Sequence, residues 1–125
     1  MKRRGIFAVA VALLAGAPAI AQDASKGEAV FKQCRACHAI GPAALNKAGP
    51  ALTGIVGRRA GSGKGFNYSD AMQEAGAGGL VWTEANLAKF LESPDTFVPN
   101  NVMASPGIKN AADRSDLIAF LKLHK

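Results

Sequence analysis

The sequence is poor in the residues that most often carry catalysis or bind metals. Its 125 residues include two cysteines, two histidines, one tryptophan and one tyrosine. It also has no basic run interleaved with aromatic residues, the pattern typical of nucleic-acid binding, so we expect no nucleic-acid partner. Segments with the alternating pattern of strands are nearly absent. We therefore expect an all-α fold of three to five helices joined by long loops.

Residues 1–21 have the three parts of a secretory signal peptide. A basic start at 2–4 precedes an apolar run over 6–17, and small residues end at Ala21. A membrane anchor is the alternative, but this run is shorter than the roughly 20 residues that span a bilayer. We expect cleavage after Ala21, a periplasmic location without stable membrane insertion, and one domain over residues 22–125. Its twelve basic and nine acidic residues give it a formal charge of +3.

Helix signals are strong at the two ends of this domain and weak in its middle. Asp23 is a good N-cap for a first helix, which we expect to continue to near His38. The segment 41–65 contains seven glycines and two prolines and has little periodicity. Such a long loop in a small domain indicates that a large apolar cofactor fills the centre. The other expected elements are a short turn or a further helix at 69–74, a helix over 84–92 between Thr83 and Pro94, and a last helix after Asn110 with Leu117, Ile118, Phe120 and Leu121 buried.

The segment Cys34-Arg35-Ala36-Cys37-His38 has the C-x-x-C-H pattern of c-type haem attachment. On one helical turn, side chains at this spacing lie about 5–6 Å apart, so two thiols and an imidazole face one ligand. A thioredoxin-type redox site would need a β-α-β context that is missing. A zinc site would need more ligands, and the only further histidine, His124, lies at the C-terminal end, where we expect fraying. A structural disulfide is the remaining alternative.

A haem iron held by one histidine has an open sixth position, which a methionine can fill. After signal removal the chain has two methionines, Met72 and Met103. Met103 follows a loop just past the helix expected over 84–92, whereas Met72 lies in the short turn. Methionine is also a common core filler. From spacing alone, ligation by Met103 and simple packing of its side chain are equally open.

The ordered series of motifs along the domain resembles class I cytochrome c, the family of small monohaem proteins with mitochondrial and bacterial periplasmic members. Only the C-x-x-C-H motif is specific by itself, but the series as a whole is far more so. The motifs are Gly27–Phe31, Cys34–His38, Gly49–Gly54 with Gly57 and Arg58, Phe66–Ala71, Trp82, Leu91–Pro94, Val98 and Pro99 before Met103, and Gly107–Lys109 with Asp116–Leu121.

This resemblance implies one haem c bound through Cys34 and Cys37, with His38 and Met103 as the axial iron ligands. It also implies that the carbonyl of Pro50 fixes the ring of His38. Further expected roles are hydrogen bonds to the haem propionates from Arg58, Tyr68 and Trp82, and close packing of Gly27 and Phe31 against Leu117 and Phe120. The alternatives are a surface charge at Arg58 and ordinary core packing for the two aromatic residues.

The function implied is that of a soluble, monomeric electron carrier rather than an enzyme. Single electrons would pass by Fe(II)/Fe(III) cycling between redox partners such as membrane oxidoreductase complexes, oxidases or periplasmic dehydrogenases, with Lys32 and Lys47 steering the encounter. A haem enzyme or a gas-binding sensor with a displaceable sixth ligand is the alternative. Departures from the family pattern at Met72, Phe90 and Asn101 alter the hydrogen-bond network that tunes the potential, and departures at Val102 and Ala104 alter the partner contacts near the exposed haem edge.

Overall fold

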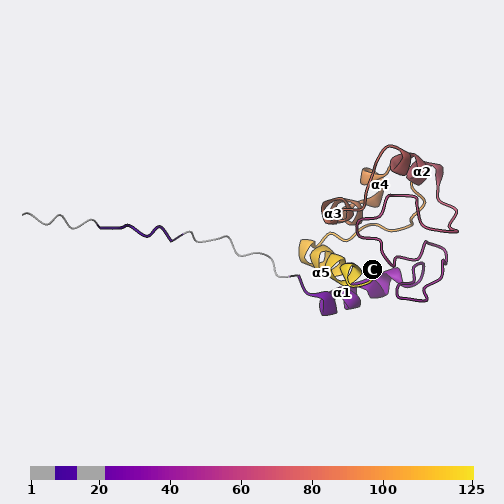
Figure 1. The fold of residues 1–125 in the computed structure, drawn as a ribbon. Helices are drawn as coiled ribbons and strands as arrows, with labels where there is room; N and C mark the ends of the chain where they lie inside the picture. The colour runs from indigo at the N-terminus through magenta and orange to yellow at the C-terminus, as the bar shows by residue number, and fades with distance from the viewer. Residues whose placement is uncertain (1–7, 14–21) are drawn as a thin grey trace, which may run out of the picture.

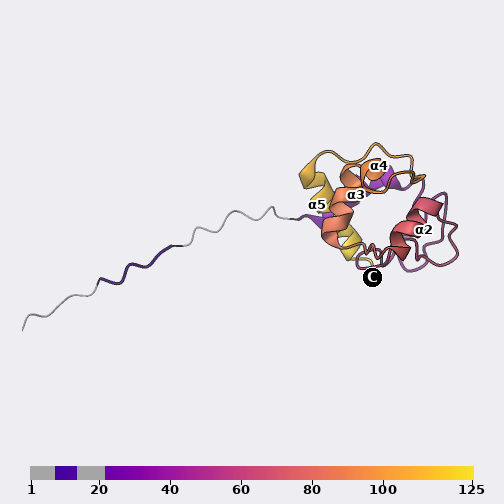
Figure 2. The same cartoon turned by 90° about the horizontal axis from the view of Figure 1, so that it is seen from above.

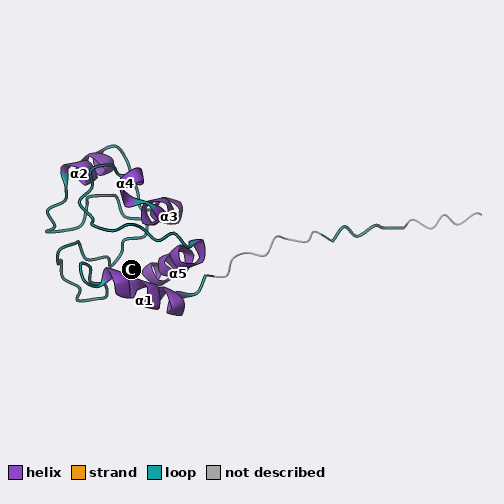
Figure 3. Ribbon diagram, turned by 180° about the vertical axis from the view of Figure 1, so that it is seen from behind, coloured by secondary structure: helices purple, strands orange, loops and turns teal. Residues whose placement is uncertain are grey.

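The computed structural model describes residues 8–13 and 22–125, so the predicted signal peptide lies largely outside the described residues. None of the described residues belongs to a strand, and the only ladder contact among them is an isolated bridge between Arg59 and Val81 (Figure 3). No helix of the described part is long and apolar enough to cross a membrane. The helices are α1 (Ala24–Phe31), a 3-10 turn (Lys32–Cys34), α2 (Asp70–Ala77), α3 (Glu84–Glu92), α4 (Pro94–Phe97) and α5 (Ala111–Lys122). The all-α prediction is confirmed.

Helices α1 and α5 cross at one end of the molecule and form its main helix pair (Figure 1). Gly27 permits this crossing, because a Cβ at that position would overlap the carbonyl of Asp116 and lie 2.9 Å from Cβ of Phe120. Phe31 is fully buried beside Phe120, with ring centroids 5.3 Å apart. Leu117 is also buried in this cluster. The predicted packing of the terminal helices is therefore confirmed.

The first helix is shorter than predicted, since α1 ends at Phe31 and the chain continues as a 3-10 turn to Cys34. In a 3-10 helix, residues i and i+3 eclipse each other. Cys34 therefore lies on the same face as Phe31 and packs against the hydrophobic core. One further turn follows, in which the amide of His38 donates to the carbonyl of Cys34 at 2.9 Å. This last turn preserves the local geometry on which the haem prediction rests.

The predicted caps are present at the later helices. Thr83 Oγ1 accepts from the amide of Asn86 at 3.1 Å and begins α3, while Asn110 Oδ1 accepts from the amide of Asp113 at 3.0 Å and begins α5. Both caps satisfy amides that the first turn of a helix leaves without partners. The further helix considered at 69–74 is present as α2, which continues to Ala77.

We expected the C-terminal end to be frayed, and this prediction is wrong. The carbonyl of His124 accepts from the amide of Gly54 at 2.7 Å. Its imidazole packs edge-on against Phe120, with ring centroids 4.8 Å apart. The last residues thus tie α5 to the long central loop.

Helix α2 is separate from the other helices. It packs against none of the other described helices, and Figure 2 shows it on the side of the molecule opposite α3 and α5. The loop around Ala60 packs closely against α2, because a Cβ at Gly76 would overlap the carbonyl of Ala60. The inner side of α2 faces the centre of the molecule, where the candidate site lies.

Candidate functional site

The two cysteines lie on the turn that follows the 3-10 segment. The carbonyl of Cys34 accepts from the amide of Cys37 at 3.1 Å and from that of His38 at 2.9 Å, so the three residues share one turn. Both thiols are free; Cys34 is half-buried and Cys37 is exposed. Burial, together with the neighbouring Cys37, raises the pKa of the Cys34 thiol. The turn therefore presents two free thiols at the edge of the core.

His38 is held in a defined orientation by the chain twelve residues further on. Its Nδ1 lies 2.8 Å from the carbonyl oxygen of Pro50. A carbonyl only accepts, so Nδ1 carries the proton and Nε2 is left with a free lone pair. Gly49 makes this close approach possible, because a Cβ there would collide with the imidazole. Burial lowers the pKa of His38 despite the bond to Pro50, and Lys47 lowers it further, which favours the neutral form that binds metals.

Met103 lies on the loop between α4 and α5, with its side chain partly buried against the core. Its neighbour Val102 is 78% exposed. Successive side chains of an extended segment point in opposite directions. Met103 therefore packs against the core, whereas Val102 beside it is exposed to solvent.

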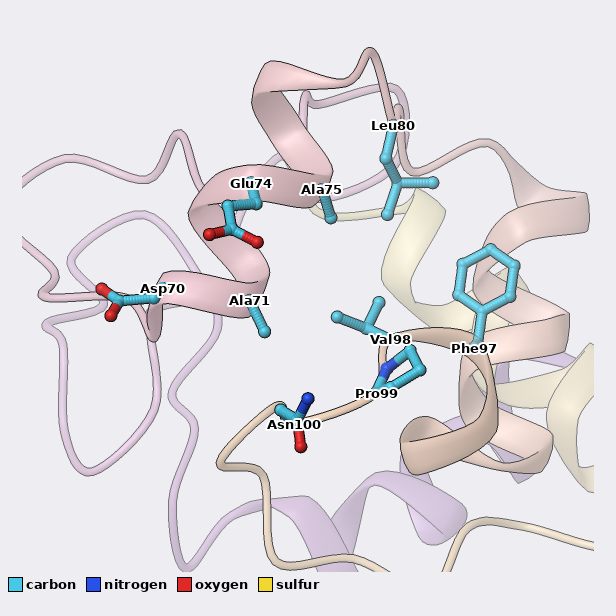
Figure 4. Close-up of a pocket in the computed structure, with 9 residues that line it drawn as sticks. All are labelled: Asp70, Ala71, Glu74, Ala75, Leu80, Phe97, Val98, Pro99 and Asn100. Atoms are coloured by element: carbon cyan, nitrogen blue, oxygen red, sulfur yellow. The ribbon is translucent and has the colours of Figure 1, made fainter.

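A cavity of about 680 Å³ separates α2 from α4 and the loop that leads to Met103. In Figure 4 the apolar side chains of Ala71, Ala75 and Val98 point toward one another across this cavity, and Leu80 and Phe97 close its far side. The carboxylates of Asp70 and Glu74 lie to one side of it (Figure 4). The inner surface is therefore apolar, as burial of a flat hydrophobic ligand requires.

A second, more polar cavity of about 490 Å³ lies beside the central loop and is lined in part by Arg58 and Lys64, with no acidic residue. Arg58 Nη1 and Nη2 donate to the carbonyls of Thr53 and Ala51 at 3.3 and 3.4 Å. The hydroxyl of Tyr68 accepts from the amide of Gly63 at 2.9 Å, on the lining of the same cavity. Arg58 and Gly63, the residue that Tyr68 binds, thus line the same cavity.

Trp82 is the third residue predicted to contact propionates. It is buried at 5% exposure. Its ring packs against Phe90, with centroids 4.9 Å apart, and its amide donates to the carbonyl of Arg58 at 2.8 Å. The backbone contact joins Trp82 to the segment that carries Arg58, but the indole itself lies among core aromatic residues.

Two asparagines form hydrogen bonds that connect segments of the site, and sequence patterns do not predict these bonds. Asn46 donates from Nδ2 to the carbonyl of Lys64 at 2.9 Å and accepts from the amide of Ala51 at 2.9 Å, which braces the central loop. Asn101 accepts from the amide of Met103 at 2.8 Å. Asn46 has no local pattern that identifies it. The sequence identifies Asn101 as a departure from the family pattern but does not predict its bond to Met103.

These residues fit a covalently attached haem. Two free thiols lie on the same turn as an imidazole whose Nε2 is available, the large cavity has an apolar interior, and the second cavity has cationic and hydroxyl groups. Thioether bonds at Cys34 and Cys37 and iron ligation by His38 match this donor set. Together the fold and the site are those of a small helical haem c protein.

Comparisons with known proteins give the family. The family model described as Cytochrome c matches residues 24–125. Cytochrome c2 from Rhodomicrobium vannielii is 50% identical over 122 residues, which is 97% of this chain and 95% of the relative. Cytochrome c2 from Agrobacterium tumefaciens is 52% identical over 99 residues, covering 79% of this chain and 89% of the relative. The solved structure of cytochrome c2 from Rhodospirillum centenum has a TM-score of 0.78 at 39% identity, covering 82% of this chain and 98% of that chain.

The chain therefore belongs to the cytochrome c family. It is an electron-transfer protein, and it binds haem c through Cys34 and Cys37. When bound, the haem supplies a one-electron Fe(II)/Fe(III) couple. The protein's own residues attach the group, orient the imidazole and provide the apolar surroundings.

Proposed function

We propose that His38 and Met103 are the two axial ligands of the haem iron, which leaves it closed to substrates and restricts the protein to carrying single electrons. The observation that carries this proposal is the orientation of the loop before α5. Met103 is partly buried against the core, whereas Val102 beside it is 78% exposed. The opposite ligand is supported by the bond from His38 Nδ1 to Pro50. Methionine ligation favours the ferrous state and raises the potential, as suits a carrier.

The test is whether carbon monoxide binds to the reduced holoprotein at neutral pH, followed by absorption spectroscopy. The wild-type protein should bind carbon monoxide slowly or not at all, and Met103→Ala should bind it rapidly. Met72→Ala is the matched control, because Met72 is also partly buried against the core. That variant should behave as the wild type does. Rapid binding by the wild-type protein would refute the closed site and favour a ligand-binding function.

We also propose that the protein works in the periplasm after cleavage behind Ala21, with the mature domain spanning residues 22–125. Support comes from the start of the family match at residue 24 and from the N-cap at Asp23, which begins the first helix of the domain. The signal itself rests on the sequence of residues 1–21. Mass spectrometry of the periplasmic fraction tests this, and the expected mature protein begins at Gln22. A mass that retains the first 21 residues would contradict it.

The partners we propose are acidic redox proteins, such as membrane oxidoreductase complexes, oxidases or periplasmic dehydrogenases, which a monomeric carrier binds transiently. Charge is distributed unevenly along the chain. Residues 29–69, which contain the haem attachment site, include six basic and no acidic residues. The remainder of the mature chain, residues 22–28 and 70–125, includes six basic and nine acidic residues. Such a distribution steers the attachment side toward a negative partner.

This steering predicts that electron-transfer rates to an acidic partner fall as salt concentration rises. Lys32→Gln should lower the rate and weaken its dependence on salt. Lys89→Gln is the matched control, because Lys89 is an exposed lysine on α3, outside the basic segment. Equal effects of the two substitutions would show that net charge alone matters and that the basic segment is not the docking side.

A further inference from the structure

We infer that Asn101 is the positioning residue for Met103: its amide fastens the backbone of Met103 to Asp95 on α4. This inference rests on the proposed ligation of iron by Met103. It concerns how this chain's own residues hold the ligand in place.

The segment before Met103 is a tight turn anchored in the core. The carbonyl of Val98 accepts from the amide of Asn101 at 3.2 Å, which closes a four-residue turn. Pro99 occupies the second position, and Asn100 has a φ of 64° at the third. Proline followed by a residue with positive φ is the arrangement of a type II turn. Because Val98 is only 4% exposed, this turn starts from a fixed point.

The side chain of Asn101 uses both ends of its amide. Its Oδ1 accepts from the amide of Met103 at 2.8 Å, and its Nδ2 donates to Oδ1 of Asp95 at 3.1 Å and to the carbonyl of Val98 at 2.9 Å. The reverse orientation would place two donors against each other at Met103 and acceptors against each other at Asp95 and Val98. The network therefore specifies the orientation of the amide.

This arrangement determines the direction in which the next residues leave the turn. With its amide hydrogen bound to Asn101, Met103 has its backbone fixed two residues after the turn, and Val102 projects outward at 78% exposure. The bond to the carboxylate of Asp95 is charge-assisted and so stronger than a neutral one. Asn101 thus links the ligand's backbone to α4, whose first residue, Pro94, is fully buried. Loss of this link should make it easier for a competing ligand to replace Met103 on the haem iron.

The experiment measures how easily added imidazole replaces Met103 in the ferric holoprotein. Two readouts are followed together: the dissociation constant for imidazole, and the weak long-wavelength band that methionine-ligated ferric haem shows. Asn101→Asp keeps the shape and the acceptor for Met103, but it places a carboxylate oxygen against Asp95. Asn101→Ala removes the whole network. Both should tighten imidazole binding on the order of tenfold, because each loses hydrogen bonds that hold the native ligand.

Two further variants distinguish positioning of the Met103 ligand from a merely structural role of Asn101. Asn86→Ala is the matched control, because Asn86 Nδ2 donates to the carbonyl of Val81 at 2.8 Å, away from the loop that carries Met103. Its imidazole affinity should stay within about twofold of the wild type. The combined substitution of Asp95→Asn with Asn101→Asp restores a donor facing an acceptor. It should recover at least part of the resistance to imidazole that Asn101→Asp alone loses.

Two results would overturn the inference. If Asn101→Asp and Asn101→Ala bind imidazole no more tightly than Asn86→Ala, Asn101 does not position the ligand. If the wild-type protein lacks the methionine band altogether, the proposed ligation fails, and this inference fails with it. The first result leaves Met103 ligation intact, so the two failures are distinguishable.

Discussion

Substitution of Gly27 by alanine tests whether the close crossing of α1 and α5 stabilises the domain. A Cβ at Gly27 would overlap the carbonyl of Asp116 and lie 2.9 Å from Cβ of Phe120. The carbonyl belongs to the helix backbone, so no change of rotamer relieves the contact. Helix α5 must move away from α1. This movement weakens the packing of Phe31 against Phe120, whose ring centroids are 5.3 Å apart.

The size of the effect follows from two opposing contributions. Alanine is better than glycine inside a helix by about 1 kcal/mol. Forcing extra atoms into a packed contact costs about 1–3 kcal/mol and occasionally more. Because the obstructing atoms at Gly27 are backbone, we take the upper end of that range. The Gly27→Ala holoprotein should therefore be less stable by about 2 kcal/mol.

The assay is guanidinium unfolding of the holoprotein, followed by far-ultraviolet circular dichroism. Gly78→Ala is the matched control, because it adds the same methyl group at the end of α2. There φ is −76° and the nearest atom to an added Cβ is the carbonyl oxygen of Glu74, at 3.4 Å. Its stability should change by less than about 0.5 kcal/mol. Equal unfolding free energies for the two variants would refute the argument that the crossing requires glycine.

Three further predictions concern the haem site and the first helix. Gly49→Ala should tilt the ring of His38 and weaken its bond to Pro50, which lowers the basicity of the imidazole and raises the reduction potential, measured by redox titration. Arg58→Gln should lower the potential, because loss of a positive charge near the haem favours the ferric form; an unchanged value would place Arg58 outside the propionate site. Hydrogen bonds from the first turn of α1 hold the pKa of Asp23 below its ordinary value of 3.8. Its ionised form therefore stabilises the fold above about pH 4, and the advantage over Asp23→Asn in guanidinium midpoint should disappear as the pH falls through the lowered pKa.

The sequence predicts best where a feature depends on contacts within one turn. The caps at Thr83 and Asn110 each bind an amide three residues ahead, so their positions were predictable from the residues themselves. The turn from Cys34 to His38 is equally local. The longer relation between His38 and Pro50 was predictable only through the family resemblance, because twelve irregular residues separate the two.

Features that depend on tertiary packing were not predictable from periodicity. The first helix changes to a 3-10 turn after Phe31, and that change brings Cys34 to the core face where Phe31 meets Phe120. No local signal marks it. The central loop is braced by Asn46, which joins Lys64 to Ala51 across segments with no repeating pattern. Loops of this kind are defined by their polar contacts, and a single sequence does not reveal the partners.

Because α2 has no helical packing partner among the described residues, we expect haem and fold to depend on each other in this protein. A helix of eight residues is marginal in water and takes its stability from tertiary packing. Among the described helices, α2 packs against no other; the loop at Ala60 contacts it at Gly76, and Ala71 and Ala75 are only partly buried against the core. Ala71 and Ala75 face Val98 across an apolar cavity (Figure 4). The haem attached at Cys34 and Cys37 is a large apolar group, so we expect its covalent attachment near α1 to stabilise α2 as well.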